Sequence, residues 1–329
     1  MSEIKKILIR LPNWLGDMVM ATAFVNAVQQ QYPQAQIDCI AKKGIDFLLD
    51  YFPTNGQRYI FSKEDYKGTL GVIRFARQIT KQQQYDLLFC LPDSLSAAIM
   101  AYFIGAKKSI GFKKSLHSIF FNHTYLKKKQ VHRVLEYVHL LEQFTQTSFD
   151  AVKVSLKADV ATSNNTLIIN INSEASSRRL PVSKAVSIIN YISKNISNPI
   201  VLIGSPKEKP FVDTVFQQLH NTTNVKNVAG ATSLPELIQL FAQSKAVLST
   251  DSGPAHISNA LGKNTVVLFG AGNEQNTAPF NNEHTFVIRL NQLLCEPCTK
   301  NICKFYTEPK CLTMLNEVTI GTAVQNALI

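Results

Sequence analysis

The stretch STDSGPAH, residues 249–256, decides the fold of this chain. An apolar run at 246–248 leads into it, a helical pattern at 257–261 leads out of it, and a second apolar run covers 265–269. The order strand, tight turn, short helix, strand is one αβ unit of a parallel sheet. The stretch therefore predicts an α/β fold.

The turn in this stretch is suited to hold an anionic ligand. It lies where the carboxyl end of a strand meets a helix N-terminus, and open α/β sheets bind anions at that place. Gly253 lets the backbone approach a ligand closely, Ser252 supplies a hydroxyl and His256 supplies a donor. An ordinary turn in which Asp251 or Ser252 caps the helix accounts for the residues equally well. The motif alone leaves both interpretations open.

Strand and helix patterns alternate along the first half of the chain. The first expected strand is 4–11, and the last expected helix of this half is 131–146. The elements expected between them are strands at 37–41, 58–61, 85–91 and 107–111 and helices at 18–31, 44–51, 70–83 and 94–104. This succession predicts a doubly wound domain.

A polar segment at 147–165 interrupts the alternation, with a weak strand at 152–156 inside it. We place an interdomain linker there, with the boundary near Asp159. The alternation then restarts and ends in a helix at 317–327. Two doubly wound domains that face each other across a cleft resemble the GT-B glycosyltransferase architecture. The expected domains are 1–158 and 159–329.

The composition describes a globular protein with a substantial core. The chain has 329 residues, which suits two α/β domains, with 45% hydrophobic and 17% charged residues. Its longest apolar run, 97–106, is too short to cross a bilayer. The N-terminal residues 1–6 lead directly into a strand pattern and lack the features of a signal peptide. We therefore expect a cytoplasmic protein.

Positive charge is concentrated in one segment of the first domain. The formal net charge is +11, and residues 107–133 contain eight Lys or Arg and no Asp or Glu. Such a surface suits nucleic acid, an acidic membrane or a phosphorylated substrate. Within it, 111–130 is basic and aromatic, without a clear period, and we expect a loop that meets a phosphorylated substrate or a membrane. A solvated loop with a few buried aromatic side chains is the alternative. The lysines expected on this surface are Lys113, Lys114, Lys127, Lys128 and Lys129.

Asp17 is the candidate catalytic residue. It follows the first expected strand, at the start of a helix, so it belongs at the carboxyl edge of the first sheet. A carboxylate at that edge is placed to act as a general base on a sugar hydroxyl. Alternatively, Asp17 only caps the helix and complements its dipole.

Two further strand ends of the second domain carry polar side chains. The first is followed by 172–181, which contains Ser173 and Arg178 before a helix that starts with a proline. Guanidinium groups bind phosphate in a bidentate manner, so this segment suits a diphosphate. The next strand is followed by Glu208, which suits ribose hydroxyls. Together with Asp251, these residues favour a nucleotide site over a set of unrelated polar loops.

Four of the six cysteines cluster near the C-terminus. Four thiolates are a common zinc-binding set, but this spacing is irregular for a zinc ribbon. Disulfides are not expected in a reducing cytoplasm. We favour a structural role without metal and keep zinc as the alternative. The cysteines are Cys295, Cys298, Cys303 and Cys311.

These motifs together resemble the ADP-heptose:lipopolysaccharide heptosyltransferases, glycosyltransferase family 9. The opening run ILIRLPNWLGDMVM, residues 7–20, is similar to the N-terminal signature of the heptosyltransferase II type. DSGPAH at 251–256 is similar to the second family signature, and RRLP at 178–181 to its basic-basic-Trp-Pro element. The cysteine spacing C-x2-C-x4-C-x7-C is also similar to a pattern in many members. The resemblance extends from about Ile4 to the C-terminus.

The resemblance implies a metal-independent, inverting GT-B enzyme that uses ADP-heptose. It implies that the N-terminal domain binds the lipid A–core acceptor at the inner membrane and that the C-terminal domain binds the donor. Asp17 matches the proposed general base, Arg178 a diphosphate contact and Glu208 a ribose-binding acid. Thr232 matches a residue beside the adenine. The residues that match the nucleotide-sugar loop are Asp251, Ser252, Gly253 and His256.

The chain departs from the family pattern at two positions. Leu180 replaces the usual Trp, and Arg178 replaces the usual Lys, so no positive charge is lost. Other functions remain open: another GT-B enzyme, a nucleotide-sugar epimerase, or a noncatalytic binder of sugar nucleotides or, ranked last, of nucleic acid. Nucleic acid is not expected as a partner, because no nucleic-acid-binding module is present in the sequence.

Overall fold

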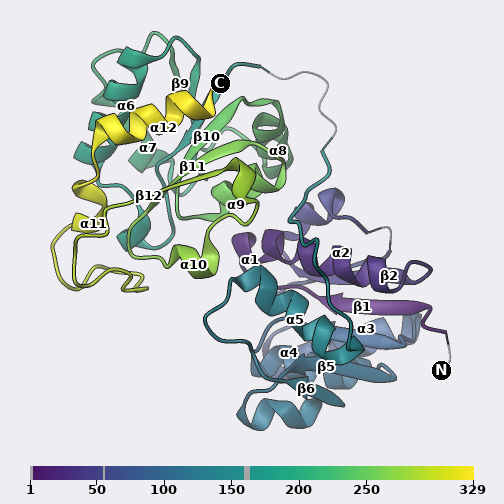
Figure 1. Ribbon diagram of the computed structural model, residues 1–329. Coiled ribbons are helices and arrows are strands. Elements are labelled where there is room, and N and C mark those ends of the chain that lie inside the picture. Colours follow the sequence, from purple (N-terminus) through teal and green to yellow (C-terminus); the bar gives the residue numbers. More distant parts are fainter. Residues whose placement is uncertain (1–2, 55, 159–163) are drawn as a thin grey trace. The chain divides into compact units, whose positions relative to one another are not determined.

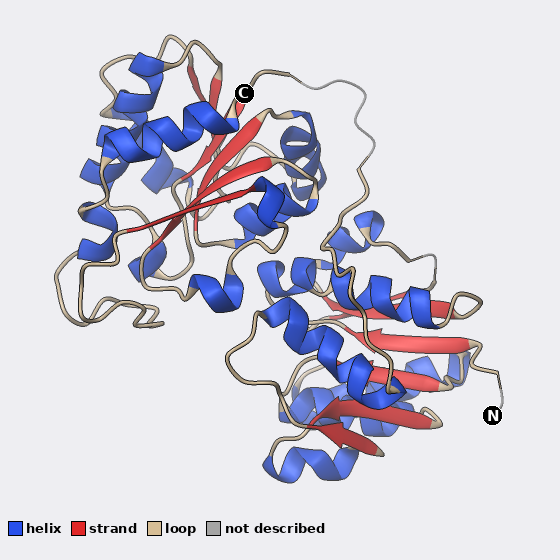
Figure 2. Cartoon of the chain, viewed as in Figure 1, coloured by secondary structure: helices blue, strands red, loops and turns tan. Residues whose placement is uncertain are grey.

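The chain forms two compact units, residues 1–156 and 157–329. The computed structural model describes residues 3–54, 56–158 and 164–329. The boundary predicted near Asp159 lies outside the described residues. Each unit has a six-stranded sheet with helices packed on it (Figures 1 and 2).

The N-terminal unit contains a fully parallel sheet in the order β3-β2-β1-β4-β5-β6. Its strands are β1 (Lys6–Arg10), β2 (Gln36–Lys42), β3 (Arg58–Phe61), β4 (Leu87–Cys90), β5 (Lys108–Phe112) and β6 (His123–Tyr125). Its helices are α1 (Leu15–Met20), α2 (Thr22–Gln31), η1 (Asp46–Tyr51), α3 (Gly68–Gln82), α4 (Leu95–Ile104), η2 (Ser115–Phe120) and α5 (Arg133–Thr145). The direction of winding reverses between β1 and β4, so the carboxyl ends of these two strands border the crevice where such sheets bind ligands.

The C-terminal unit repeats this topology in a second parallel sheet, β12-β11-β10-β7-β8-β9. Its strands are β7 (Leu167–Asn170), β8 (Ile200–Leu202), β9 (Val225–Asn227), β10 (Ala246–Thr250), β11 (Asn264–Phe269) and β12 (Thr285–Arg289). Its helices are η3 (Ser176–Arg178), α6 (Val182–Asn195), α7 (Lys209–Gln217), α8 (Leu234–Gln243), α9 (Gly253–Ala260), α10 (Glu274–Thr277), η4 (Asn282–His284), α11 (Lys310–Thr313) and α12 (Glu317–Ala327). Here the winding reverses between β7 and β10.

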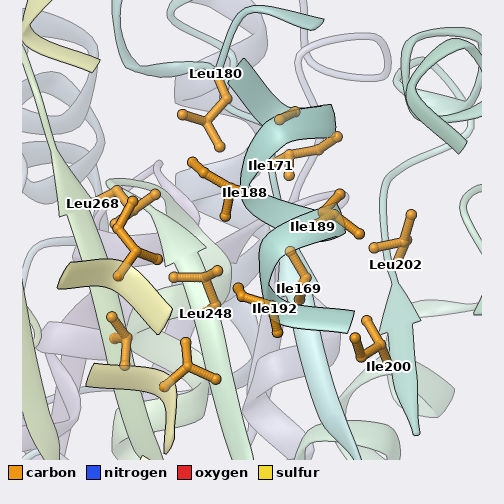
Figure 3. Close-up of a cluster of buried hydrophobic side chains, with 14 of the residues drawn as sticks. Ile169, Ile171, Leu180, Ile188, Ile189, Ile192, Ile200, Leu202, Leu248 and Leu268 are labelled. Carbon is orange, nitrogen blue, oxygen red and sulfur yellow. The ribbon is translucent and has the colours of Figure 1, made fainter. Parts of the chain in front are cut away.

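Branched aliphatic side chains fill the space between the second sheet and its helices. In Figure 3, Ile188 and Ile192 of α6 lie beside Ile169, Leu248 and their neighbours on the strands. All of these side chains are at most 1% exposed. A parallel sheet covered on both faces needs such continuous apolar strands, and this is why the strands could be located from the sequence.

The expected loop at 111–130 is wrong in part, because the structure contains η2 and β6 there. The strand β6 has three residues and pairs with β5 in the register Ile110↔His123. Its position is set by Asn122, which accepts hydrogen bonds from the backbone and the hydroxyl of Ser109 at 2.8 and 2.9 Å. The residues of β6, His123, Thr124 and Tyr125, form no apolar run that could mark a strand in the sequence.

The weak strand expected at 152–156 is also wrong. The backbone N–H of Ser155 donates to the hydroxyl of Thr22 at 3.1 Å, and Asn26 donates to the Ser155 hydroxyl at 3.2 Å. This segment therefore packs along α2 and does not join a sheet. The expected helix at 44–51 is present as the shorter 3₁₀ helix η1. Among the described residues, no helix is long and apolar enough to cross a membrane.

Candidate functional site

The carboxyl ends of β7 and β10 are joined by a buried amide. Asn170 is 3% exposed, and its Nδ2 donates to the hydroxyls of Ser249 and Ser252 at 3.1 and 2.9 Å. Ser252 in turn donates to the carbonyl of Thr250 at 3.1 Å. These bonds fix the start of α9 at the point where the sheet changes its direction of winding.

A second amide extends this arrangement to β8. Asn172 donates from Nδ2 to the carbonyl of Ile203 at 2.9 Å. The carbonyl of Asn172 accepts a hydrogen bond from the hydroxyl of Thr250. Three adjacent strand ends are thus held together by side chains, which makes a rigid base for a ligand.

Asp251 is a buried carboxylate at the centre of this edge. Its side chain is 4% exposed, and Oδ2 lies 3.3 Å from a terminal guanidinium nitrogen of Arg178. Burial raises the pKa of Asp251 to about 6, while Arg178 and Arg289 oppose that rise. A Cβ atom at Gly272 would lie 1.9 Å from Asp251 Oδ2, so only glycine leaves room for the carboxylate.

Arg289, at the end of β12, brings a second cation near Asp251. Its side chain is 6% exposed and forms an ion pair with Glu274 at 2.7 Å. It also donates to the carbonyl of Gly272. Nε of Arg178 and both Nε and one terminal nitrogen of Arg289 are buried without a hydrogen-bond partner. Unsatisfied guanidinium donors beside a helix N-terminus are suited to an anion such as a diphosphate.

The loop that carries Arg178 is held by the cysteine-containing segment. The backbone N–H of Ser177 donates to the carbonyl of Asn301 at 3.2 Å, and its hydroxyl donates to the carbonyl of Lys300 at 2.5 Å. The N–H of Thr299 donates to the carbonyl of Ala271 at 2.7 Å. Residues 299–301 therefore connect the Arg178 loop with the end of β11.

Neither Asp251 nor Ser252 caps α9 through its side chain. Ser252 occupies the N-cap position of α9, but no side chain makes a capping hydrogen bond. Gly253 is the first helical residue, and His256 lies within α9 and is 6% exposed. The motif thus places its polar groups at the strand edge instead of on the helix N–H groups.

The other residues predicted to bind the nucleotide sugar, Ser173, Glu208 and Thr232, border the same sheet and differ in how far they are buried. Ser173 is 8% exposed and follows β7. Glu208 accepts a hydrogen bond from the backbone N–H of Ser205 at 2.8 Å, so it stabilises the turn between β8 and α7. Thr232 is half-buried and directly precedes Ser233, which forms a capping box with Glu236 at the start of α8.

Asp17 lies in the first turn of α1, after β1. It is not the helix cap, because Trp14 occupies that position. Arg10, at the end of β1, is 4% exposed and donates to the carbonyl of Leu11 at 2.5 Å and to Oδ1 of Asn13 at 2.6 Å. These bonds hold the turn that leads into α1, so the position of Asp17 is well defined.

The carboxyl group of Asp17 is partly buried beside a cation. Its side chain is 26% exposed, and Oδ1 lies 3.9 Å from Nε of Arg133. Burial raises the pKa of Asp17, Arg133 and Lys127 lower it, and Glu136 raises it. The net shift is upward, which increases the basicity of the carboxylate.

Two of the five predicted surface lysines take part in ion pairs. Lys127 lies 3.0 Å from Glu136 and 3.2 Å from Asp93, and Lys114 lies 3.6 Å from Asp93. Glu136 also accepts from Arg133 at 2.9 Å. The side chains from Asp17 to Asp93 therefore form one connected set of charges at the carboxyl edge of the first sheet. Lys113, Lys128 and Lys129 are exposed.

The four C-terminal cysteines form no disulfide bonds. Cys311, in α11, is buried and packs on Gly270, where a Cβ atom would lie 2.9 Å from its sulfur. Burial raises the pKa of Cys311 to about 11. In the part of the chain that the structure describes, no three His, Cys, Asp or Glu side chains are grouped to hold a metal ion.

The structure adds residues that sequence reasoning missed. Asn170 ends an otherwise apolar strand run, and this polar residue was a usable signal, since amides are seldom buried without a partner. No comparable sequence signal marked Arg289, Glu136 or Asp93. They are far from their partners in the sequence and reach them only through the sheet order.

The chain is similar to heptosyltransferases over most of its length. Lipooligosaccharide heptosyltransferase 2 of Campylobacter jejuni strain 81116 is 27% identical over 310 residues, which cover 91% of this chain and 92% of that protein. Lipopolysaccharide heptosyltransferase 2 of Escherichia coli K12 is 24% identical over 307 residues, with 87% and 88% coverage.

Solved structures share the fold, so the predicted GT-B fold is confirmed. ADP-heptose LPS heptosyltransferase II of E. coli matches with a TM-score of 0.81 and 21% identity over 98% of each chain. A family 9 glycosyltransferase of Veillonella parvula matches with a TM-score of 0.85 and 19% identity, covering 98% of this chain and 97% of that one. The sequence model of glycosyltransferase family 9 (heptosyltransferase) matches residues 72–307. The chain therefore belongs to glycosyltransferase family 9, the heptosyltransferases.

Proposed function

We propose that this glycosyltransferase moves heptose from ADP-heptose to the inner core of lipopolysaccharide. The observation that carries the proposal is the pairing of Arg178 with buried Asp251 beside a helix N-terminus, at the point where the sheet changes its direction of winding. The relatives named above are heptosyltransferases of lipopolysaccharide or lipooligosaccharide. The activity of these relatives supports the choice of sugar and acceptor, and the geometry around Arg178 supports the proposed diphosphate site.

The donor site is assigned to the C-terminal unit. The diphosphate takes hydrogen bonds from Arg178 and from the N–H groups at the start of α9, where Gly253 leaves the backbone accessible. Ser173 and His256 border the same edge, with the hydroxyl of Ser252 held by Asn170. Glu208 and Thr232 are assigned to the ribose and adenine end.

The acceptor site is assigned to the N-terminal unit, with Asp17 as the general base. The acceptor hydroxyl oxygen attacks the anomeric carbon while the bond from that carbon to the diphosphate oxygen breaks. Asp17 takes the hydroxyl proton, and ADP leaves with the bonding electrons. The reaction is a single displacement and inverts the anomeric centre.

Charge that grows on the leaving ADP needs stabilisation. Arg178 and the N-terminus of α9 supply it in this proposal, so the residues themselves serve as the cationic clamp and no metal is required. The buried amides Asn170 and Asn172 keep the clamp rigid, which reduces the reorganisation needed during the reaction.

The reaction is assigned to the cytoplasmic face of the inner membrane, where a lipid-linked acceptor is presented. The exposed lysines Lys113, Lys128 and Lys129 make the N-terminal unit suited to a peripheral contact with anionic lipid or with acceptor phosphates.

The test is ADP release from ADP-heptose, with and without a truncated lipid A–core acceptor. Acceptor-dependent release is the expected result. Release without acceptor, together with an altered sugar, would instead favour an epimerase. Tight ADP binding without turnover would preserve the donor site and exclude this sugar or acceptor. If ADP did not bind, the assignment of the C-terminal unit would be wrong.

A further inference from the structure

Three large apolar side chains of the N-terminal unit are exposed close together in sequence. Leu116 and Ile119 of η2 are 78% and 71% exposed, and Leu126, directly after β6, is 68% exposed. Single exposed apolar residues are common on protein surfaces. A group of them is different, because contiguous apolar patches mark interaction sites.

Two ion pairs show that the start of η2 and the turn after β6 lie side by side. Lys114 precedes η2 and Lys127 follows Leu126, and both approach the same carboxylate, Asp93, at 3.6 and 3.2 Å. The short η2 helix packs on α4 through Phe120, whose ring lies 5.8 Å from that of Tyr102. Tyr102 is itself 56% exposed and extends the apolar surface.

The charge around these side chains is entirely positive along the chain. No Asp or Glu occurs between Asp93 and Glu136. Lys114 and Lys127 form ion pairs with Asp93 and Glu136. These two acids are the residues that bound the stretch without Asp or Glu. The exposed cations left at the rim are Lys113, Lys128 and Lys129, for which the described residues show no ion pair.

We propose that η2 and the turn after β6 form a membrane-docking surface for an anionic bilayer. Leu116, Ile119 and Leu126 insert into the headgroup region, and the three free lysines contact the phosphates of anionic lipid. Insertion of apolar side chains combined with attraction of lysines to anionic lipid is the usual basis of interfacial binding. This surface is named the η2 patch below.

The η2 patch rests on the proposed function, because a lipid-linked acceptor requires the enzyme to work at a bilayer. It deepens that function through its position. Lys127 at the patch contacts Glu136, which accepts from Arg133 beside Asp17. The docking surface and the proposed base therefore belong to the same connected charges, at the edge of the sheet where the acceptor hydroxyl is expected.

The test is co-sedimentation of the full chain with vesicles, without donor or acceptor. Phosphatidylcholine vesicles are compared with vesicles that also contain phosphatidylglycerol. The apolar variant is Leu116→Ser with Ile119→Ser and Leu126→Ser. Its matched control is Leu70→Ser with Leu294→Ser, at positions that are 83% and 109% exposed. The charge variant carries Lys113→Gln, Lys128→Gln and Lys129→Gln, and its control carries Lys63→Gln, Lys67→Gln and Lys81→Gln.

The expected result is binding of the wild type to anionic vesicles, stronger at low salt because screening weakens the lysine contribution. The apolar variant should lose roughly 100-fold in vesicle partition, since three exposed side chains no longer gain burial. The charge variant should lose its preference for anionic lipid. Both control variants should bind as the wild type does, and circular dichroism and ADP affinity should be unchanged in the apolar variant.

Two outcomes would overturn the η2 patch. The wild type could fail to bind anionic vesicles, or the apolar variant could bind them as tightly as the wild type. If, in the second case, the apolar variant also lost turnover with a detergent-dispersed acceptor, the patch would be an acceptor contact instead. Failure of the proposed function is distinguished from these, because vesicle binding needs neither ADP-heptose nor the acceptor.

Discussion

The buried carboxylate of Asp251 makes a quantitative prediction about stability and pH. Its pKa is about 6 in the folded chain, against an ordinary value of 3.8, and burial is the main cause. Between about pH 4 and about pH 6, the Asp251 carboxyl group is therefore protonated in the folded chain and ionised in the unfolded chain. The stabilising contribution is therefore complete below about pH 4 and is lost as the pH rises through about 6. A shift of about 2 units corresponds to about 3 kcal/mol.

The variant Asp251→Asn removes this titration and keeps the shape of the side chain. From about pH 4 to about pH 7, the wild type should lose about 3 kcal/mol of stability relative to Asp251→Asn. Any cost of the substitution that does not depend on pH cancels in this comparison. The measurement is native-state hydrogen exchange of peptides from β10 and α9, with each rate corrected for the intrinsic pH dependence.

Ser252→Ala is the matched control in the same loop. It removes the hydroxyl that bonds Asn170 and Thr250 and should cost about 1 kcal/mol at every pH. Its stability profile should therefore run parallel to that of the wild type. If the profile of Asp251→Asn also ran parallel to the wild type, the carboxyl group would not titrate near pH 6, and the argument from burial would be refuted.

Four more predictions concern the two sites and the cysteines. Asp17→Asn should lower kcat by a factor of ~10²–10⁴ with ADP affinity unchanged, and near-normal turnover in steady-state assays would remove the assignment as base. Arg133→Gln should move the acidic limb of the pH profile of kcat/KM to higher pH, because Arg133 lowers the pKa of Asp17. The control Arg133→Lys keeps the positive charge and should move this limb less. Identical pH profiles for the wild type and Arg133→Gln would contradict this prediction. Gly272→Ala should cost about 1–3 kcal/mol and weaken ADP binding in calorimetry, since the new Cβ would collide with Asp251, and unchanged affinity and Tm would contradict the close packing. Metal analysis of protein purified without chelator should find no stoichiometric zinc, and one zinc per chain would assign a metal role to the cysteines Cys295, Cys298, Cys303 and Cys311.

Local patterns in the sequence were sufficient to locate most strands and helices. Runs such as 246–248 and 265–269 are apolar because parallel strands are covered on both faces, and the turns between them carry Gly and polar residues. Some of the short elements escaped detection. The three-residue strand β6 depends on Asn122 bonding to Ser109, thirteen residues away.

The strand ends likewise showed where candidate residues lie, but not which of them meet. Asp17, Arg178 and Asp251 each follow an expected strand, so their placement at a carboxyl edge followed from sequence position. The 3.3 Å contact between Arg178 and Asp251 did not. The two residues are brought together because β7 and β10 are neighbours in the sheet, although about seventy residues separate them in the chain.

By itself, the sequence determined the repeated α/β alternation, the candidate carboxylates and the turn that we propose as the phosphate site, because each depends on neighbouring residues. The tertiary structure decided their environment. It buried Asp251 and raised its pKa, paired Lys114 and Lys127 with acids outside their own segment, and left Leu116 and its neighbours exposed. Burial and charge pairing depend on residues that are distant in sequence and adjacent only after folding. For that reason no local pattern could have revealed them.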